Sequence, residues 1–162
     1  MTTIGEMSPV RALRRKFQRQ RPTVYSSSWR LTEQAVERVL DGLFAFDSKE
    51  FRLALFRHES NAGARSRSYR ELTHECPTTD GYERGGKPIT LAVRRRGWGA
   101  TVEYSRVLWI AGYNEIAADR MVIYDPDDDA VIAFTNCEGA RTLAGKPFLL
   151  MPGPLFTLET EP

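Results

Sequence analysis

The sequence predicts a mainly β protein, an antiparallel β-sandwich or flattened barrel of about seven to eight strands with one N-terminal amphipathic helix and a basic N-terminal arm. Three observations lead to this prediction. Short runs rich in β-branched and aromatic residues recur between turn signals through most of the chain. A single segment, 32–44, spaces its apolar residues as a helix does. Residues 1–28 are basic and too polar to fold alone.

The clearest structural signal is the stretch Arg120–Thr135, which predicts a β-hairpin. Apolar runs at 121–124 and 130–135 flank Asp125-Pro-Asp-Asp-Asp129, whose side chains can bond their own backbone and favour a tight reversal. Both arms are almost continuously apolar. We therefore expect each arm to have one face on the core and the other covered by a second layer or a neighbouring subunit.

The segment 32–44 predicts the helix. Thr32 suits the N-cap position, and Glu33 suits the positive end of the helix dipole. The apolar residues on one face are Ala35, Val36, Val39, Leu40, Leu43 and Phe44.

Further strands are predicted at 51–56, 88–93, 100–105, 107–111, 148–151 and 155–158. Residues 58–68, rich in Gly, Ser, Asn and Arg, predict a surface loop, and 69–72 predicts a short extended piece. Arg94-Arg-Arg-Gly-Trp-Gly99 predicts the basic tip of a hairpin. At 162 residues with 41% hydrophobic content the chain can build one core of ordinary size, so we divide it into an arm, 1–28, and a β domain, 29–162.

Charge is unevenly placed along the chain. Residues 1–30 contain seven Lys or Arg and one acid, a net +6, and the whole chain carries +2, so residues 31–162 carry −4. A basic arm on a mildly acidic body predicts an acidic partner, either nucleic acid or a protein surface. A solvated, disordered tail is the other interpretation.

The candidate partner-binding residues lie in the arm or at the predicted hairpin tip, and each carries a positive charge or an aromatic ring. They are Arg11, Arg14, Arg15, Lys16, Phe17, Arg19, Arg21, Tyr25, Trp29, Arg94, Arg95, Arg96 and Trp98. If the arm is ordered, we expect its three aromatic residues to anchor it on another chain or on the protein's own body. Any nucleic-acid contact should be salt-sensitive and indifferent to sequence, because no known reading module surrounds these residues.

Catalytic residues, cofactors and metal ions are not predicted. His74 and Cys76 would face one side of a strand, so a thiolate–imidazole pair is conceivable, but no Asn or Asp is placed to orient the imidazole. The Asp125–Asp129 cluster lacks the alternating ligands, central Gly and distant Glu of a calcium loop, which favours a solvated turn. Gly81–Lys87 lacks the spacing and the following Ser or Thr of a phosphate-binding loop.

Compartment and membrane association follow from the same composition. Cys76 and Cys137 form no disulfide framework and are expected to be buried free thiols. No run approaches the roughly 20 apolar residues of a membrane span, and the N-terminus lacks the apolar core of a signal peptide. We expect synthesis and use in a reducing cytoplasm, or export only as part of something larger.

Three stretches, taken in order, resemble a family of tailed-bacteriophage virion structural proteins, which are small β proteins encoded among head and tail genes. The first is the helix followed by Phe51-Arg-Leu-Ala-Leu-Phe56. The second is Tyr69, then Glu75, then Gly81-Tyr-Glu-Arg-Gly-Gly-Lys87. The third runs through Trp109, 118–124, the polar turn, 130–134 and the closing Gly153-Pro-Leu-Phe-Thr-Leu158.

The resemblance covers residues 31–159 and leaves out the basic arm. It implies a binding and assembly role without chemistry, with the major capsid protein or other virion subunits as partners, in a virion assembled in the host cytoplasm. We interpret the protein as a capsid decoration or minor head protein that binds its neighbours through its β body and its arm. A neck or tail ring component is one alternative, and a free, sequence-indifferent nucleic-acid-binding protein is another.

Overall fold

The computed structural model describes residues 23–25, 28–42, 45–79, 81–97, 99–113, 115–141 and 147–159. These residues form ten strands, one α-helix and two short 3-10 helices. In chain order the elements are β1 (Thr23–Tyr25), β2 (Arg30–Leu31), α2 (Glu33–Leu40), η1 (Phe46–Ser48), β3 (Glu50–Phe56), η2 (Tyr69–Glu71), β4 (Lys87–Arg96), β5 (Gly99–Tyr104), β6 (Val107–Ile110), β7 (Ala117–Asp125), β8 (Ala130–Arg141), β9 (Pro147–Leu150) and β10 (Gly153–Glu159).

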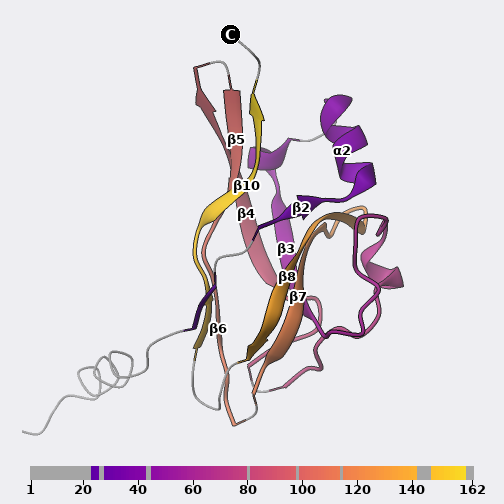
Figure 1. Cartoon of the computed structure of the whole chain (residues 1–162), viewed down its shortest axis with the longest axis vertical. Helices are drawn as coiled ribbons and strands as arrows, with labels where there is room; N and C mark the ends of the chain where they lie inside the picture. The colour runs from indigo at the N-terminus through magenta and orange to yellow at the C-terminus, as the bar shows by residue number, and fades with distance from the viewer. Residues whose placement is uncertain are drawn as a thin grey trace, which may run out of the picture.

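Seven strands form an antiparallel sheet in the order β10-β5-β4-β3-β7-β8-β2. Its two edge strands, β10 and β2, lie against each other, so the sheet is nearly closed into a barrel (Figure 1). A smaller sheet has the order β1-β9-β6, with β1 parallel to β9. The prediction of a mainly β protein with one helix is confirmed, and the barrel-like form is the one observed.

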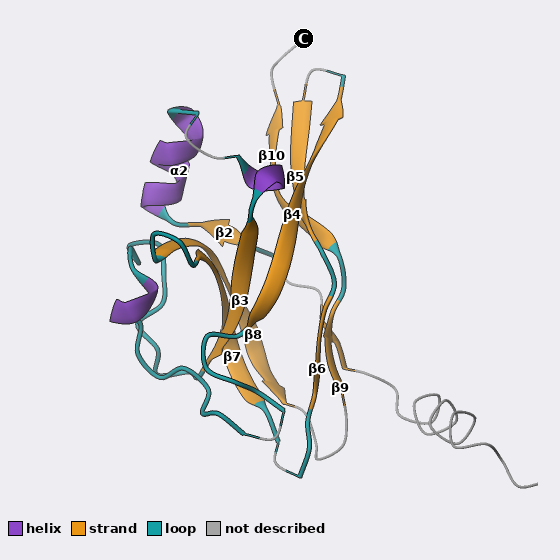
Figure 2. Cartoon of the chain, turned by 180° about the vertical axis from the view of Figure 1, so that it is seen from behind, coloured by secondary structure: helices purple, strands orange, loops and turns teal. Residues whose placement is uncertain are grey.

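A long two-stranded ribbon joins the two sheets. Strand β5 runs into β6 and β9 runs into β10, each after a break of two residues, and the pairing resumes in step: Tyr104 lies opposite Gly153 and Val107 opposite Leu150. Figure 2 shows β6 and β9 continuing below β5 and β10. Because a strand rises about 3.3 Å per residue, the ribbon from Gly99 to Ile110 is about 40 Å long.

The central strands are buried on both faces. On β3, Phe51, Leu53 and Leu55 face the main core, while Ala54 and Phe56 belong to a second cluster on the other side. The second cluster also contains Val122, Val131 and Phe134 from β7 and β8, and residues of the 57–72 segment cover it. The expected second layer over the hairpin is therefore this segment of the same chain.

The 57–72 segment differs from the sequence prediction at its end. Residues 69–71 form the 3-10 turn η2 and not an extended piece. The Tyr69 ring stacks on Tyr124, with ring centroids 4.2 Å apart and planes 10° apart. This contact between residues distant in sequence, together with the hydrogen bond from Leu72 N to Tyr69 O at 3.0 Å, favours the turn over a local extended preference.

Helix α2 begins where the sequence predicts and ends earlier. The Thr32 hydroxyl caps it by accepting from Ala35 N at 3.3 Å. Asp41 is the C-cap and Gly42 takes a left-handed φ of 69°, a conformation that ends helices at low cost for glycine.

Only part of the predicted apolar face of α2 packs against the core. Ala35 is fully buried and Val39 packs on the core, but Val36 is 43% exposed and Leu40 is 79% exposed. Leu43 and Phe44 lie outside the described residues. Among the helices of the described residues, none is long and apolar enough to cross a membrane.

Gly86 offers a test of how closely β3 and the start of β4 are packed. Its φ is +75°, and a Cβ at this position would lie 1.8 Å from Leu53 O. We expect Gly86→Ala to lower the free energy of unfolding by about 3 kcal/mol, because it combines backbone strain with a clash against fixed backbone. Equilibrium urea unfolding measures this loss.

Gly63→Ala is the matched control, since a Cβ there meets nothing within 4 Å. We expect it to change the free energy of unfolding by no more than about 0.5 kcal/mol. Equal losses for the two variants would contradict the packing described for Gly86.

Candidate functional site

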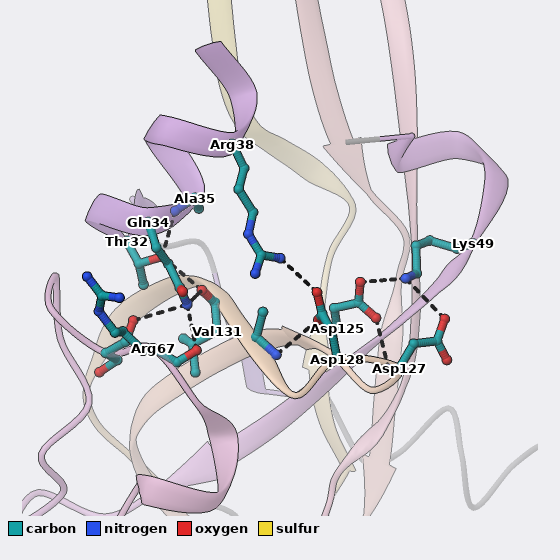
Figure 3. Close-up of polar contacts among 12 residues, drawn as sticks. Thr32, Gln34, Ala35, Arg38, Lys49, Arg67, Asp125, Asp127, Asp128 and Val131 are labelled. Carbon is teal, nitrogen blue, oxygen red and sulfur yellow. Dashed lines mark hydrogen bonds and ion pairs between the residues drawn. The ribbon is translucent and has the colours of Figure 1, made fainter. Parts of the chain in front are cut away.

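The acidic turn between β7 and β8 carries several hydrogen bonds and ion pairs (Figure 3). Asp125 accepts a hydrogen bond from Asp127 N at 3.0 Å, and Asp128 accepts one from Ala130 N at 3.2 Å. The prediction that these side chains bond their own backbone is confirmed. Asp129 completes the turn with a left-handed φ of 63°.

Cations from three other parts of the chain neutralise this turn. Lys49, just before β3, lies 2.5 Å from Asp125 and 3.0 Å from Asp127. Arg38 of α2 lies 2.8 Å from Asp128, and Figure 3 shows it reaching down from the helix.

Arg70 of η2 lies 3.0 Å from Asp129. Burial raises the pKa of Asp129, but hydrogen bonds from Ser68 and Arg70 outweigh it and lower that pKa below its ordinary value.

The acidic turn is therefore a structural tie between the helix, the start of β3 and the 57–72 segment. The expectation of a simply solvated turn is wrong for Asp125, which is 3% exposed. The hydrogen bond to Asp125 raises the pKa of Lys49, against partial burial that lowers it. Within the described ranges, no group of three His, Cys, Asp or Glu side chains could hold a metal ion.

A second polar cluster surrounds Glu75. Its carboxylate accepts hydrogen bonds from the Tyr82 hydroxyl at 2.8 Å, from Gly85 N at 2.7 Å and from the Tyr69 hydroxyl. The Tyr82 oxygen in turn accepts from Leu55 N of β3 at 2.9 Å. The cluster therefore fixes the 81–86 turn onto the central strand.

The Glu75 cluster explains the Gly-Tyr-x-x-Gly-Gly motif as structural support. The sequence analysis named these residues but did not predict their contacts. The Tyr82 hydroxyl bonds both Glu75 and Leu55 N of β3, and contacts of this kind between separate segments cannot be read from a local pattern. Burial, followed by the charge of Glu75, raises the pKa of Tyr82 above its ordinary value.

His74 and Cys76 do not form the pair that a strand would allow. His74 has a left-handed φ of 59°, which breaks the alternation, and its side chain is exposed. Cys76 is 2% exposed, and its thiol donates to Ala117 O at 3.0 Å. Burial raises the pKa of Cys76 to about 12, so its reactive thiolate form is rare at neutral pH. The prediction of two buried free thiols, Cys76 and Cys137, is confirmed.

The basic hairpin exists, but its arginines lie in strand β4 and not in the turn. Arg96 pairs with Gly99 in the register, and Trp98 between the strands lies outside the described residues. Arg94 forms an ion pair with Glu103 at 2.5 Å. Because successive strand residues point to opposite faces, Arg94 and Arg95 do not form one continuous row of charge. The side chain of Arg96 lies outside the described part of the structure.

The arm residues divide into three groups. Arg11, Arg14, Arg15, Lys16, Phe17, Arg19 and Arg21 lie outside the described residues. Tyr25 belongs to β1, which pairs with β9, so part of the segment assigned to the arm contacts the body. Trp29 is 9% exposed and packs edge-on against Tyr104, with ring centroids 5.7 Å apart. Trp29 therefore anchors on the protein's own body, one of the two outcomes expected for it.

Large apolar side chains remain exposed at separated places on the body. They are Val36, Leu40, Ile110, Tyr113, Met151 and Leu158. Leu158 pairs with Ala100 at one end of the ribbon, and Ile110 pairs with Pro147 at the other. Sequence reasoning missed these positions, because all but Tyr113 fall in runs that read as core.

Comparison with known proteins found no relative of this chain. No protein-family model, no curated protein and no solved structure matches the chain. The functional argument therefore rests on the residues themselves.

Tyr82→Phe tests the Glu75 cluster through pH. At pH 7 we expect a loss of about 1–3 kcal/mol in the free energy of unfolding, because buried Leu55 N loses its acceptor. The folded pKa of Tyr82 is raised above the ordinary value of 10.0, so the protonated phenol stabilises the fold below pH 10. Above pH 10 the unfolded chain releases a proton that the folded chain keeps, and stability falls as pH rises.

The Tyr82→Phe variant lacks this titratable proton. Its free energy of unfolding should therefore fall less steeply with rising pH above pH 10, by up to about 1.4 kcal/mol per pH unit. Urea unfolding between pH 8 and roughly pH 11, which spans the ordinary tyrosine pKa, measures both effects. Identical pH slopes for parent and variant would show that Tyr82 is not held as described.

Lys49→Met tests the acidic turn. The change leaves the buried Asp125 carboxylate without its cation, and we expect a loss of about 2 kcal/mol in the free energy of unfolding. Arg94→Gln is the matched control, since its pair with Glu103 is equally short but Arg94 is 63% exposed. That variant should lose at most about 1 kcal/mol. A larger loss for Arg94→Gln than for Lys49→Met would overturn this ranking.

Proposed function

We propose that this protein is a non-enzymatic structural component of a tailed-bacteriophage virion, attached to the capsid as a decoration or minor head protein. The resemblance of residues 31–159 to that family supports the class. The structural observation that carries the proposal is the exposure of large apolar side chains at both ends of the ribbon and on α2. These side chains are available for contact with neighbouring subunits.

The body does not need a partner to complete its core. Both faces of β3 are buried within the chain, so the exposed apolar residues are not left over from an unfinished layer. Val36 and Leu40 lie one turn apart on the same face of α2. Fully burying a side chain of this size contributes about 1.5–3 kcal/mol, and several weak contacts held together in one particle bind far more tightly than one.

Charge supports a tethering role for the arm. Residues 1–30 carry +6 and residues 31–162 carry −4, so an arm is attracted to acidic faces on neighbouring subunits. Free nucleic-acid binding is less well supported, since Arg94 is already paired with Glu103 and the body is acidic. A neck or tail ring component would use the same contacts in fewer copies per particle.

The test is incorporation into particles by two full-length variants and one truncation. A chain lacking residues 2–21 keeps β1 and its pairing with β9, and Leu40→Glu removes the most exposed apolar residue of α2. We expect each to lower occupancy at least about tenfold, which corresponds to the loss of one buried apolar contact or more. Glu37→Gln, an exposed change on the same helix, should keep the parent's occupancy.

Quantitative mass spectrometry of purified virions gives the occupancy and the copy number. A truncated chain present at full occupancy would contradict the tether, and full occupancy of Leu40→Glu would contradict the role of α2. Only a few copies of the parent per particle would favour the neck or tail ring. Steeply salt-dependent binding of the isolated protein to duplex DNA would favour the nucleic-acid alternative.

A further inference from the structure

The 57–72 segment contains a pocket that none of the roles described above uses. Its volume is about 360 Å³, and it is open to solvent. The polar residues that line it are Asn61, Arg65, Ser66, Arg67, Ser68 and Glu71. Of these six residues, Ser68 also takes part in the acidic-turn tie, through its hydrogen bond to Asp129.

The backbone oxygens around this pocket are already occupied by the body. Arg120 donates to Ser60 O and to Ala62 O, both at 2.7 Å. Glu33 N donates to Ala64 O at 2.8 Å. Gln34 donates to Arg67 O at 2.5 Å, a contact that Figure 3 shows reaching from the first turn of α2. These four carbonyl groups are thus turned toward the protein and satisfied.

Some backbone donors of the same loop bond within the loop, such as Gly63 N to the Ser66 hydroxyl, but others do not bond the protein. Within the described part of the chain, the N–H groups of Ala64, Arg65, Arg67 and Ser68 have no hydrogen-bond acceptor. The guanidinium of Arg65 is 92% exposed and reaches Glu33 only at 4.0 Å. Arg67 is also exposed and has no ion-pair partner among the described residues. Backbone donors without a protein acceptor, next to two arginines, have the chemistry that an anion requires.

We propose that this pocket binds a single carboxylate group, supplied by an acidic segment of a neighbouring protein. The planar guanidinium of arginine matches a carboxylate with two parallel hydrogen bonds. Glu71 on the pocket wall and Glu33 beside Arg65 would repel a chain of phosphates, and residues 31–162 carry −4. These charges select one compact anion over a nucleic-acid backbone. The proposal rests on the proposed function only for the source of the carboxylate, a neighbouring subunit.

The loop is fixed before any ligand arrives. Arg120 of β7 and two residues of α2, Glu33 and Gln34, hold its carbonyl groups, so binding need not order the backbone. Preorganisation of this kind lowers the entropic cost of binding. A pocket of this design is suited to weak individual contacts that act together in an assembly.

The test is a titration of the isolated full-length chain, followed by its backbone amide NMR signals. The probe is an acetylated and amidated pentapeptide with one central Asp, and its Asn counterpart is the uncharged control. We expect the Asp peptide to shift the amide signals of Ala64, Arg65, Arg67 and Ser68, and the Asn peptide to leave them unchanged. Arg67→Gln should weaken binding at least about tenfold, because a charge-assisted hydrogen bond is lost.

Arg106→Gln, an exposed arginine on the ribbon, is the control for net charge and should bind as the parent does. Absence of shifts, equal binding of the Asn peptide, or an unchanged affinity for Arg67→Gln would overturn the proposal. Tighter binding of inorganic phosphate or duplex DNA than of the Asp peptide would overturn the choice of carboxylate. The titration needs no particle, so its failure is distinguishable from a failure of particle incorporation.

Discussion

Two-sided burial of the central strands is the constraint on which the rest of the structure depends. Strand β3 presents Leu55 to the main core and Phe56 to the second cluster, so two layers must cover it. The barrel interior supplies one layer, and the 57–72 segment supplies the other. Because that segment has little regular structure, its backbone groups need partners from side chains. The side chains of Arg120, Gln34 and Asn61 meet this need by donating to carbonyl groups of the segment.

The helix is held to the body largely by polar contacts, and this explains its exposed apolar face. Thr32 donates to Val131 O at 2.8 Å, Gln34 donates to Val131 O at 3.0 Å, and Arg38 pairs with Asp128. With these contacts at its start and along one side, α2 needs only Ala35 and Val39 against the core. Leu40 is then free to be buried by a different chain.

Sequence reasoning succeeded where a short-range pattern decides the structure. The Asp125–Asp129 turn, the Thr32 cap and the alternation of β3 are all set by neighbouring residues. It failed where contacts between distant residues decide. Strand β2 has two residues and no readable period, and the turn at Tyr69 depends on stacking against Tyr124. The exposure of Leu40 could not be foreseen, because periodicity shows that a face is apolar and not what covers it.

The internal pairing of the acidic turn also bears on where the arm attaches. The turn is the densest acidic stretch of the described body, yet Lys49, Arg38 and Arg70 already neutralise it. Displacing those cations would leave Asp125 buried without a partner, which costs more than an exposed ion pair contributes. The arm of a neighbouring copy therefore gains little at this turn. Under the proposed assembly role, the charges therefore favour an acidic face on a different subunit as the acceptor for the arm.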